Sequence, residues 1–172
     1  MEEAMLPRYR KILYATDLSA TARQALRHVA AFEECFDAAV TVLHVLPDPL
    51  ELFSEQAGMD LEQAFGEDGA HWINQGEYTN AGKAMRQRLE ALAAEDFSSE
   101  RSARHFAEAE VKIVCGDPAE QILQEAQKGG YELVVMGTHG HGRLLGMVLG
   151  SVAQQTIRSS RIPVLVVPLP EE

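Results

Sequence analysis

The fold of this chain is decided by the stretch LVVMGTHGHGRLLGMVLGS, which is residues 133–151. Its first four residues are an apolar run typical of a buried strand, and Gly137 and Gly140 follow that run closely. Gly150 and Ser151 end the stretch, where a helix over residues 151–159 is predicted to begin. Glycines between a strand and a helix let the backbone close around an anion, and the helix start offers unpaired N–H groups. The stretch therefore predicts a phosphate-binding loop in an α/β protein.

Other buried-strand patterns precede and follow this loop, separated by helical patterns. Strands are predicted over residues 11–16, 39–46, 110–115, 132–136 and 163–167. Their runs are apolar throughout, as expected for parallel strands with helices packed on both faces. Parallel neighbours must be joined by crossover connections, which are right-handed. We therefore predict an α/β fold of the doubly wound, Rossmann-like kind, with a five-stranded parallel sheet and helices on both faces.

The helices carry start and stop signals. Ser19 is predicted to cap the first helix. Asp117 is predicted to cap a later one, with Pro118 at its first position and Glu120 completing a capping box. That helix is expected to stop at Gly129-Gly130. Apolar spacing marks the buried faces of the first helix and of a long helix before the third strand, at Ala22, Ala25, Leu26, Val29 and Ala30, and at Tyr78, Ala81, Met85, Leu89, Leu92 and Ala93.

Length and composition indicate one domain over residues 1–172, with an irregular excursion over about 47–80. The 26 acidic residues outnumber the 15 basic ones, and the net charge of −11 disfavours nucleic acids and anionic membranes as partners. No apolar run approaches membrane-spanning length. Cys35 and Cys115 have no disulfide or metal spacing and are predicted to be free thiols, buried or half-buried. We expect a cytoplasmic protein.

Three segments are predicted at the carboxyl ends of strands. Thr16 and Asp17 follow the first strand, Val45 ends the second, and the glycine loop follows the fourth. Doubly wound sheets bind ligands where the winding direction reverses. If the first and fourth strands are neighbours, the three segments surround one crevice, but the residues alone do not establish strand order. Two alternatives remain. Asp17 could serve only to support the first helix, and the glycine loop could be a plain turn.

These residues resemble the universal stress protein family. The resemblance is carried by KILYATDLS at 11–19, by LHV at 43–45, by Gly137-x2-Gly140-x9-Gly150-Ser151, and by IPVLVVP at 162–168. It covers nearly the whole chain outside the excursion. It implies the strand order 3-2-1-4-5 and a homodimer paired through the fifth strands, at Val164, Leu165, Val166 and Val167. The glycine motif is that of the family branch that binds ATP.

Carried over to this chain, the resemblance implies an ATP site. Asp17 would contact the ribose or lie near the adenine, and the Val45 backbone would bond the adenine edge. Arg143, more than His141, would balance the negative charge of the phosphates. The loop has no Walker-type lysine, so Mg²⁺ or Mn²⁺ is an expected bridge between phosphate oxygens. The full expected set is Ala15, Thr16, Asp17, Val45, Met136, Gly137, Thr138, His139, Gly140, His141, Gly142, Arg143, Gly150, Ser151 and Val152.

Three functions remain open at this point. The favoured one is an ATP-binding regulatory or stress-response module with an unidentified protein partner. The second is a slow ATPase or a nucleotidyl-transfer enzyme on the same scaffold, for which no convincing general base is found. The third is a dimeric interaction protein that binds no nucleotide. His139 and His141 lack further ligands nearby in the sequence, so no metal site is expected there. The chain contains no P-loop motif and no nucleophile elbow.

Overall fold

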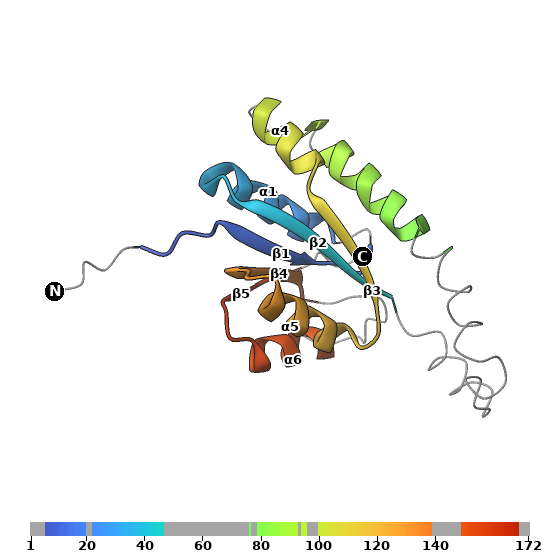
Figure 1. Ribbon diagram of the computed structural model, residues 1–172, viewed down its shortest axis with the longest axis vertical. Helices are drawn as coiled ribbons and strands as arrows, with labels where there is room; N and C mark the ends of the chain where they lie inside the picture. The colour runs from blue at the N-terminus through green and yellow to red at the C-terminus, as the bar shows by residue number, and fades with distance from the viewer. Residues whose placement is uncertain are drawn as a thin grey trace.

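The computed structural model describes residues 6–19, 22–46, 76, 79–92, 94–95, 100–138 and 149–168. A five-stranded parallel sheet runs through them in the order β3-β2-β1-β4-β5, which confirms the predicted order and direction (Figure 1). The strands are β1 (Lys11–Ala15), β2 (Ala39–Leu46), β3 (Glu110–Cys115), β4 (Leu133–Gly137) and β5 (Val164–Val167). Each agrees with its predicted range to within one residue at either end.

Helices cover both faces of this sheet, as predicted (Figure 1). One face is covered by α1 (Arg23–Phe36), by the helical residues 79–92 and by α4 (Glu100–Ala107). The other face is covered by α5 (Pro118–Lys128) and α6 (Ser151–Ser159). No helix in the described ranges is long and apolar enough to cross a membrane.

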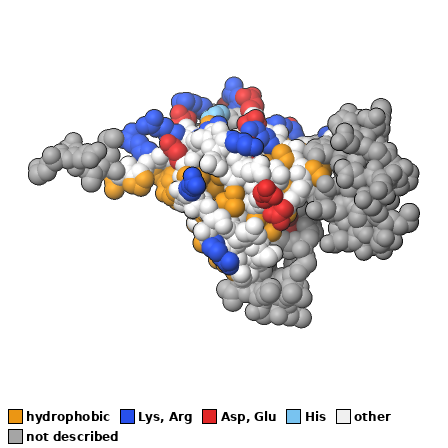
Figure 2. Space-filling model, turned by 60° about the horizontal axis from the view of Figure 1, so that its bottom comes forward, with side chains coloured by type: hydrophobic (Ala, Val, Ile, Leu, Met, Phe, Trp, Pro, Cys, Tyr) orange, Lys and Arg blue, Asp and Glu red, His pale blue; other side chains and the backbone are white. Residues whose placement is uncertain are grey.

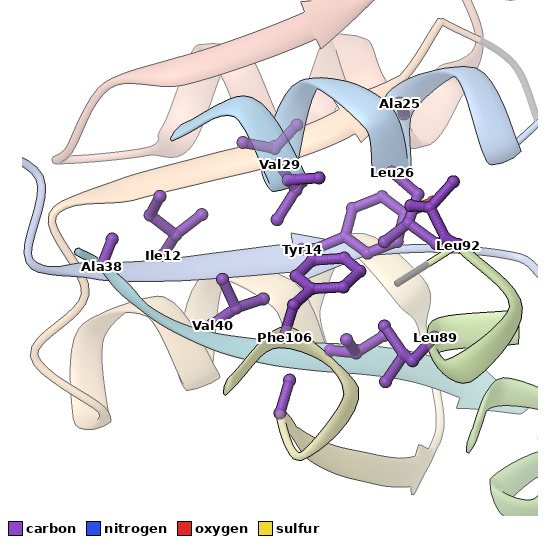
Figure 3. Close-up of a cluster of buried hydrophobic side chains, with 14 of the residues drawn as sticks. Ile12, Tyr14, Ala25, Leu26, Val29, Ala38, Val40, Leu89, Leu92 and Phe106 are labelled. Atoms are coloured by element: carbon purple, nitrogen blue, oxygen red, sulfur yellow. The ribbon is translucent and has the colours of Figure 1, made fainter. Parts of the chain in front are cut away.

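The side chains of β1 divide between the two cores because successive residues of a strand point to opposite faces. Ile12 and Tyr14 belong to the cluster under α1, whereas Leu13 and Ala15 belong to the cluster under α5 and α6. Figure 3 shows Val29 reaching from α1 toward β1 within the first cluster. Full burial of one large apolar side chain contributes about 1.5–3 kcal/mol. A strand buried on both faces is therefore held by two cores at once.

The start of α1 and the exposure of Cys35 differ from the predictions. Ser19 does not cap α1: the N-cap position is Ala22, without a side-chain cap bond. Ser19 Oγ instead accepts from Ala22 N–H at 3.2 Å, so its capping chemistry serves the turn ahead of the helix. Cys35 is exposed because it points away from the face of α1 that packs on the sheet, while Cys115 is half-buried.

The start and end of α5 match the prediction, but the Glu120 side chain bonds along the helix and not back to Asp117 N–H, as a capping box requires. Asp117 is the N-cap and accepts from Glu120 N–H at 2.8 Å, with Pro118 in the first turn. The Glu120 carboxylate accepts from Gln124 Nε2 at 3.0 Å, a contact along the helix. Gly129 is the C-cap and Gly130 has φ of 65°, a left-handed conformation that favours glycine.

The predicted excursion over 47–80 lies outside the described residues except for 76, 79 and 80, which are helical. Of the long predicted helix, positions 81, 85, 89 and 92 are buried, as its apolar spacing indicates. A single domain over residues 1–172 stays a prediction.

Candidate functional site

The winding of the sheet reverses between β1 and β4. The chain leaves β1 for α1 on one face, and it leaves β4 for α6 on the other face. These two strands are neighbours in the sheet, with Tyr14 paired to Val135. Two adjacent strands whose helices depart to opposite faces leave a crevice beyond their carboxyl ends, which is where sheets of this kind bind ligands.

A tight turn over residues 16–19 follows the carboxyl end of β1. Thr16 N–H donates to Leu43 O at 3.0 Å, and Leu18 N–H donates to Thr16 Oγ1 at 3.2 Å. Leu18 has φ of 65°, a left-handed backbone conformation that costs a branched residue about 1–2 kcal/mol. Non-glycine strain of this kind tends to cluster at functional sites.

Asp17 lies in this turn, at the position that the sequence predicts. Its Oδ1 accepts from Ser19 N–H at 3.0 Å, so the carboxylate does support the approach to α1. That support is the alternative to a ligand contact. The bond uses one carboxylate oxygen in the turn, and a carboxylate has further acceptor positions on both oxygens, so the two roles are compatible.

His44 links the turn to the neighbouring strand. It is 8% exposed, and its Nδ1 lies 2.7 Å from Thr16 O. Because a carbonyl oxygen only accepts, Nδ1 must carry the hydrogen. His44 is therefore a hydrogen-bonded core residue. Sequence reasoning missed its second effect, which is to set the position of the Thr16–Asp17 turn relative to β2.

The backbone of Val45 is directed to the side of β2 on which β1 lies. Leu43 O accepts from Thr16 N on the β1 side of β2, whereas Leu46 O accepts from Gly116 N on the β3 side. Peptide groups alternate sides along a strand, so Val45 directs its N–H and C=O to the β1 side. Since β1 ends at Ala15, which pairs with Leu43, Val45 lies beyond the end of its neighbour.

The two ends of the glycine loop are brought together beyond the carboxyl end of β4. Thr138 N–H donates to Val167 O at 2.9 Å, and Gly150 N–H donates to Thr138 O at 2.8 Å. The start of α6 is thereby placed next to the end of β4. Met136 is buried under this edge, and Gly137 is the last residue of β4. His139, Gly140, His141, Gly142 and Arg143 lie outside the described residues.

The first turn of α6 has the properties of an anion site. The N-cap is Gly150, which has no side chain that could cap the helix. The first bond of the helix is from Gln154 N–H to Gly150 O at 3.0 Å, so the N–H groups of Ser151 and Val152 precede the helical ladder. Gln154 Nε2 also donates to Leu149 O at 2.9 Å, a contact that the sequence did not suggest.

Tyr14 connects the carboxyl end of β1 to the core under α1. Its hydroxyl donates to Ala22 O at 2.9 Å, which joins β1 to the start of α1. Burial raises the pKa of Tyr14 to about 12, and the nearby Asp17 carboxylate acts in the same direction. The phenol therefore stays neutral and keeps its donor role at any physiological pH.

Known proteins share this sheet and its strand order. The model of the universal stress protein family matches residues 8–168. Universal stress protein MJ0577 of Methanocaldococcus jannaschii is 33% identical over 167 residues, covering 92% of this chain and 94% of that protein. A solved structure of MJ0577 superposes with a TM-score of 0.71 at 30% identity, covering 96% of this chain and 100% of that one.

Two further relatives extend the comparison. Universal stress protein YxiE of Bacillus subtilis is 30% identical over 162 residues, covering 92% of this chain and 99% of that protein. A universal stress protein solved in complex with cAMP is 16% identical with a TM-score of 0.55, covering 95% of this chain and 100% of that one. At that identity the likeness shows a shared fold. The match over nearly the whole length, on a sheet of the expected order, means that this chain belongs to the universal stress protein family.

Proposed function

We propose that this chain is a regulatory module that binds ATP across the carboxyl ends of β1, β2 and β4. The observation that carries the proposal is the convergence of three segments at the point where the winding reverses. These are the Thr16–Asp17 turn, the outward-facing backbone of Val45, and the start of α6 next to Thr138. A nucleotide has three parts that match them: a ribose, a base and a phosphate tail.

Each part of the nucleotide meets a suitable group in this arrangement. The Asp17 carboxylate accepts from the ribose hydroxyls, beside Ala15 and Thr16. The peptide groups of Val45 pair with the adenine edge, which has both a donor and an acceptor. The phosphates lie against the N–H groups of Ser151 and Val152, where the dipole of α6 favours negative charge.

The remaining predicted residues complete the phosphate end. Met136, Gly137 and Thr138 form the floor of the site, and His139, Gly140, His141, Gly142 and Arg143 are the residues proposed to contact the phosphates. Arg143 and a Mg²⁺ or Mn²⁺ ion balance their charge. The net charge of −11 does not oppose this, because the phosphates respond to the local field of the helix start and the loop. The relative in complex with cAMP is a case in which a protein of this fold holds an adenine nucleotide.

The regulatory part of the proposal concerns what the phosphates do to the loop. A phosphate tail held at α6 gives residues 139–149 contacts that a nucleoside alone does not give. Binding therefore sets the conformation of the loop, and a protein partner recognises that conformation. We also propose that two copies pair through β5, which is an edge strand with an apolar sequence.

The test is calorimetric titration of the protein with ATP, ADP and AMP in the presence of Mg²⁺. Affinity that rises with the number of phosphates, and that is lost in Gly140→Val, supports the proposal. Gly130→Ala is the matched control, because Gly130 lies before the amino end of β4, away from the proposed site at the carboxyl ends. Its replacement strains the backbone without touching that site. Absence of binding by the unaltered chain would overturn the proposal.

A phosphate-release assay separates binding from turnover. Hydrolysis requires a group that activates water in line with the terminal phosphate. The proposal expects ATP to stay intact over many times the residence time of the complex. Rapid release of phosphate, lost in Gly140→Val, would instead establish the alternative of an ATPase.

A further inference from the structure

A second cluster of ionisable groups lies near the amino ends of the strands, away from the proposed nucleotide site at their carboxyl ends. Glu33 and Asp37 at the carboxyl end of α1 meet His105 of α4. One ligand atom from each lies within 4.8 Å of the other two. We propose that these three side chains bind a divalent transition metal, and that Zn²⁺ is the ion that fits them. The ion would join α1 to α4.

Glu33 gives the strongest reason for an ion at this place. Its side chain is 2% exposed, and Oε1 lies 2.8 Å from His105 Nδ1. In the described part of the chain, Glu33 Oε2 is buried without a hydrogen-bond partner. A buried oxygen left unsatisfied costs about 1–3 kcal/mol, and more if it is charged. A cation at this place would remove that deficit.

Asp37 is held in place to act as the second carboxylate. It is the C-cap of α1 in a left-handed conformation, with φ of 53°, and its N–H donates to Glu33 O at 2.8 Å. The cap therefore folds Asp37 back over the last turn of the helix, beside Glu33. Its side chain pairs with Arg101 at 3.7 Å, but both groups are largely exposed, and such pairs contribute little. A bound ion can displace that contact.

The cluster opens into a hollow that leaves room for water ligands. The hollow has a volume of about 660 Å³ and is lined by Asp37, Glu100, Arg101, Arg104, His105 and Glu108. With Glu33, its acidic groups outnumber its two arginines, so the local charge favours a cation. Figure 2 shows charged side chains of both signs side by side along the upper rim of the molecule, with further charged groups on the face below.

The kind of ligand selects the kind of metal. Mg²⁺ and Ca²⁺ prefer sites made of oxygen atoms alone, whereas imidazole nitrogen suits zinc and other transition metals. One histidine and two carboxylates leave a fourth position for water, which is the arrangement of an open zinc site. This set differs from the phosphate-bridging Mg²⁺ or Mn²⁺ proposed at the nucleotide site in both ligands and place, so either proposal can fail without the other.

The test is calorimetric titration with Zn²⁺ of the full chain without nucleotide, followed by thermal unfolding at saturating Zn²⁺. One ion per chain and a higher unfolding temperature are expected. Asp37→Asn should weaken binding at least about tenfold, in line with the 10–100-fold cost of disturbing even outer groups of metal sites. Asn tolerates the left-handed conformation, so this variant keeps the fold. His105→Gln should weaken Zn²⁺ binding similarly. When Co²⁺ is used as a spectroscopic probe in place of Zn²⁺, this variant should also lack the visible absorption of the bound ion.

Two controls decide where the ion binds. His28→Gln removes an exposed histidine of the same helix α1 and should bind Zn²⁺ as the unaltered chain does. A double change, His139→Gln with His141→Gln, removes the paired histidines of the glycine loop and should also leave binding unchanged. Loss of binding in the double variant would overturn the proposal, as would unchanged binding in Asp37→Asn and His105→Gln, or no binding at all.

Discussion

The Asp17 carboxylate has one observed role and one proposed role, and a single substitution can separate them. Oδ1 accepts from Ser19 N–H in the turn, and the negative charge serves the proposed ribose contact. Asp17→Asn keeps an acceptor for Ser19 and removes the charge. A hydrogen bond to a charged group contributes about 1.5–3 kcal/mol, and about 1.4 kcal/mol is a tenfold change in affinity. We expect ATP affinity to fall about tenfold or more by calorimetry, with the unfolding temperature nearly unchanged.

Asp17→Ala is the companion variant, because alanine also removes the acceptor of the turn. It should lose ATP affinity and unfold at a lower temperature than Asp17→Asn. Equal ATP affinity in Asp17→Asn and the unaltered chain would show that this carboxylate is only a support for the approach to α1.

At the scale of elements, the end of α5 allows steric and conformational effects to be compared at adjacent glycines. A Cβ at Gly129 would clash with the Tyr131 ring, whereas a Cβ at Gly130 would meet nothing within 4 Å. Gly130→Ala therefore strains only the backbone, at about 1 kcal/mol. Gly129→Ala must displace a buried ring and should cost about 1–3 kcal/mol. Urea unfolding should rank Gly129→Ala as the less stable variant, and the reverse order would contradict the close approach of Gly129 to the Tyr131 ring.

The contact between α1 and α4 has a pH dependence of its own. The pKa of Glu33 is raised above 4.5, first by burial, with the hydrogen bond to His105 acting against the shift. A raised carboxyl pKa means that the folded chain holds this proton to higher pH than the unfolded chain. The stability that the proton confers is present below pH 4.5 and is lost as the pH rises through the folded pKa.

Glu33→Gln cannot ionise and keeps an acceptor for His105. Relative to this variant, the unaltered chain should therefore lose stability as the pH rises, in urea unfolding with a chelator present. Arg101→Gln, which changes only an exposed partner of Asp37, is the control and should leave the pH profile in place. Parallel profiles for Glu33→Gln and the unaltered chain would contradict the shift.

At the scale of the whole molecule, the sheet has two edges, β3 and β5, and only β5 is apolar throughout. β3 has Glu110 and Lys112 on its strand, and Lys112 Nζ donates to Glu125 of α5 at 2.6 Å. Charged groups on an edge discourage pairing with another sheet, whereas a bare apolar edge invites it. The proposed homodimer therefore uses β5.

Val166→Lys should weaken that dimer, because Val166 is partly exposed in the single chain and would be covered by a second copy. Sedimentation should show a shift toward monomer. Val111→Lys on the other edge strand is the matched control and should leave the dimer intact. An unchanged dimer in Val166→Lys would exclude this interface.

Local signals explain why so much of the fold could be predicted. Three signals define the ends of α5: the turn at Gly116 with φ of 127°, the cap at Asp117 and the left-handed Gly130 after the last turn. Each of them acts only on residues within about one helical turn of itself. The start of α1 was predicted wrongly because Ser19 satisfies a turn that the apolar spacing does not reveal. Strand order followed from the family resemblance. Residues alone did not provide it, since pairing between distant strands leaves no local pattern.

The sequence by itself determined the elements of this protein and the edge where its proposed site lies. Apolar runs, helix caps and glycines act over a few residues, and the carboxyl ends of parallel strands must share one edge. Only the tertiary structure decided which side chains from different elements meet. His44 reaches Thr16 from the next strand, and Glu33 meets His105 across 72 residues. Such contacts depend on how helices and strands pack, and packing is a property of the whole folded chain.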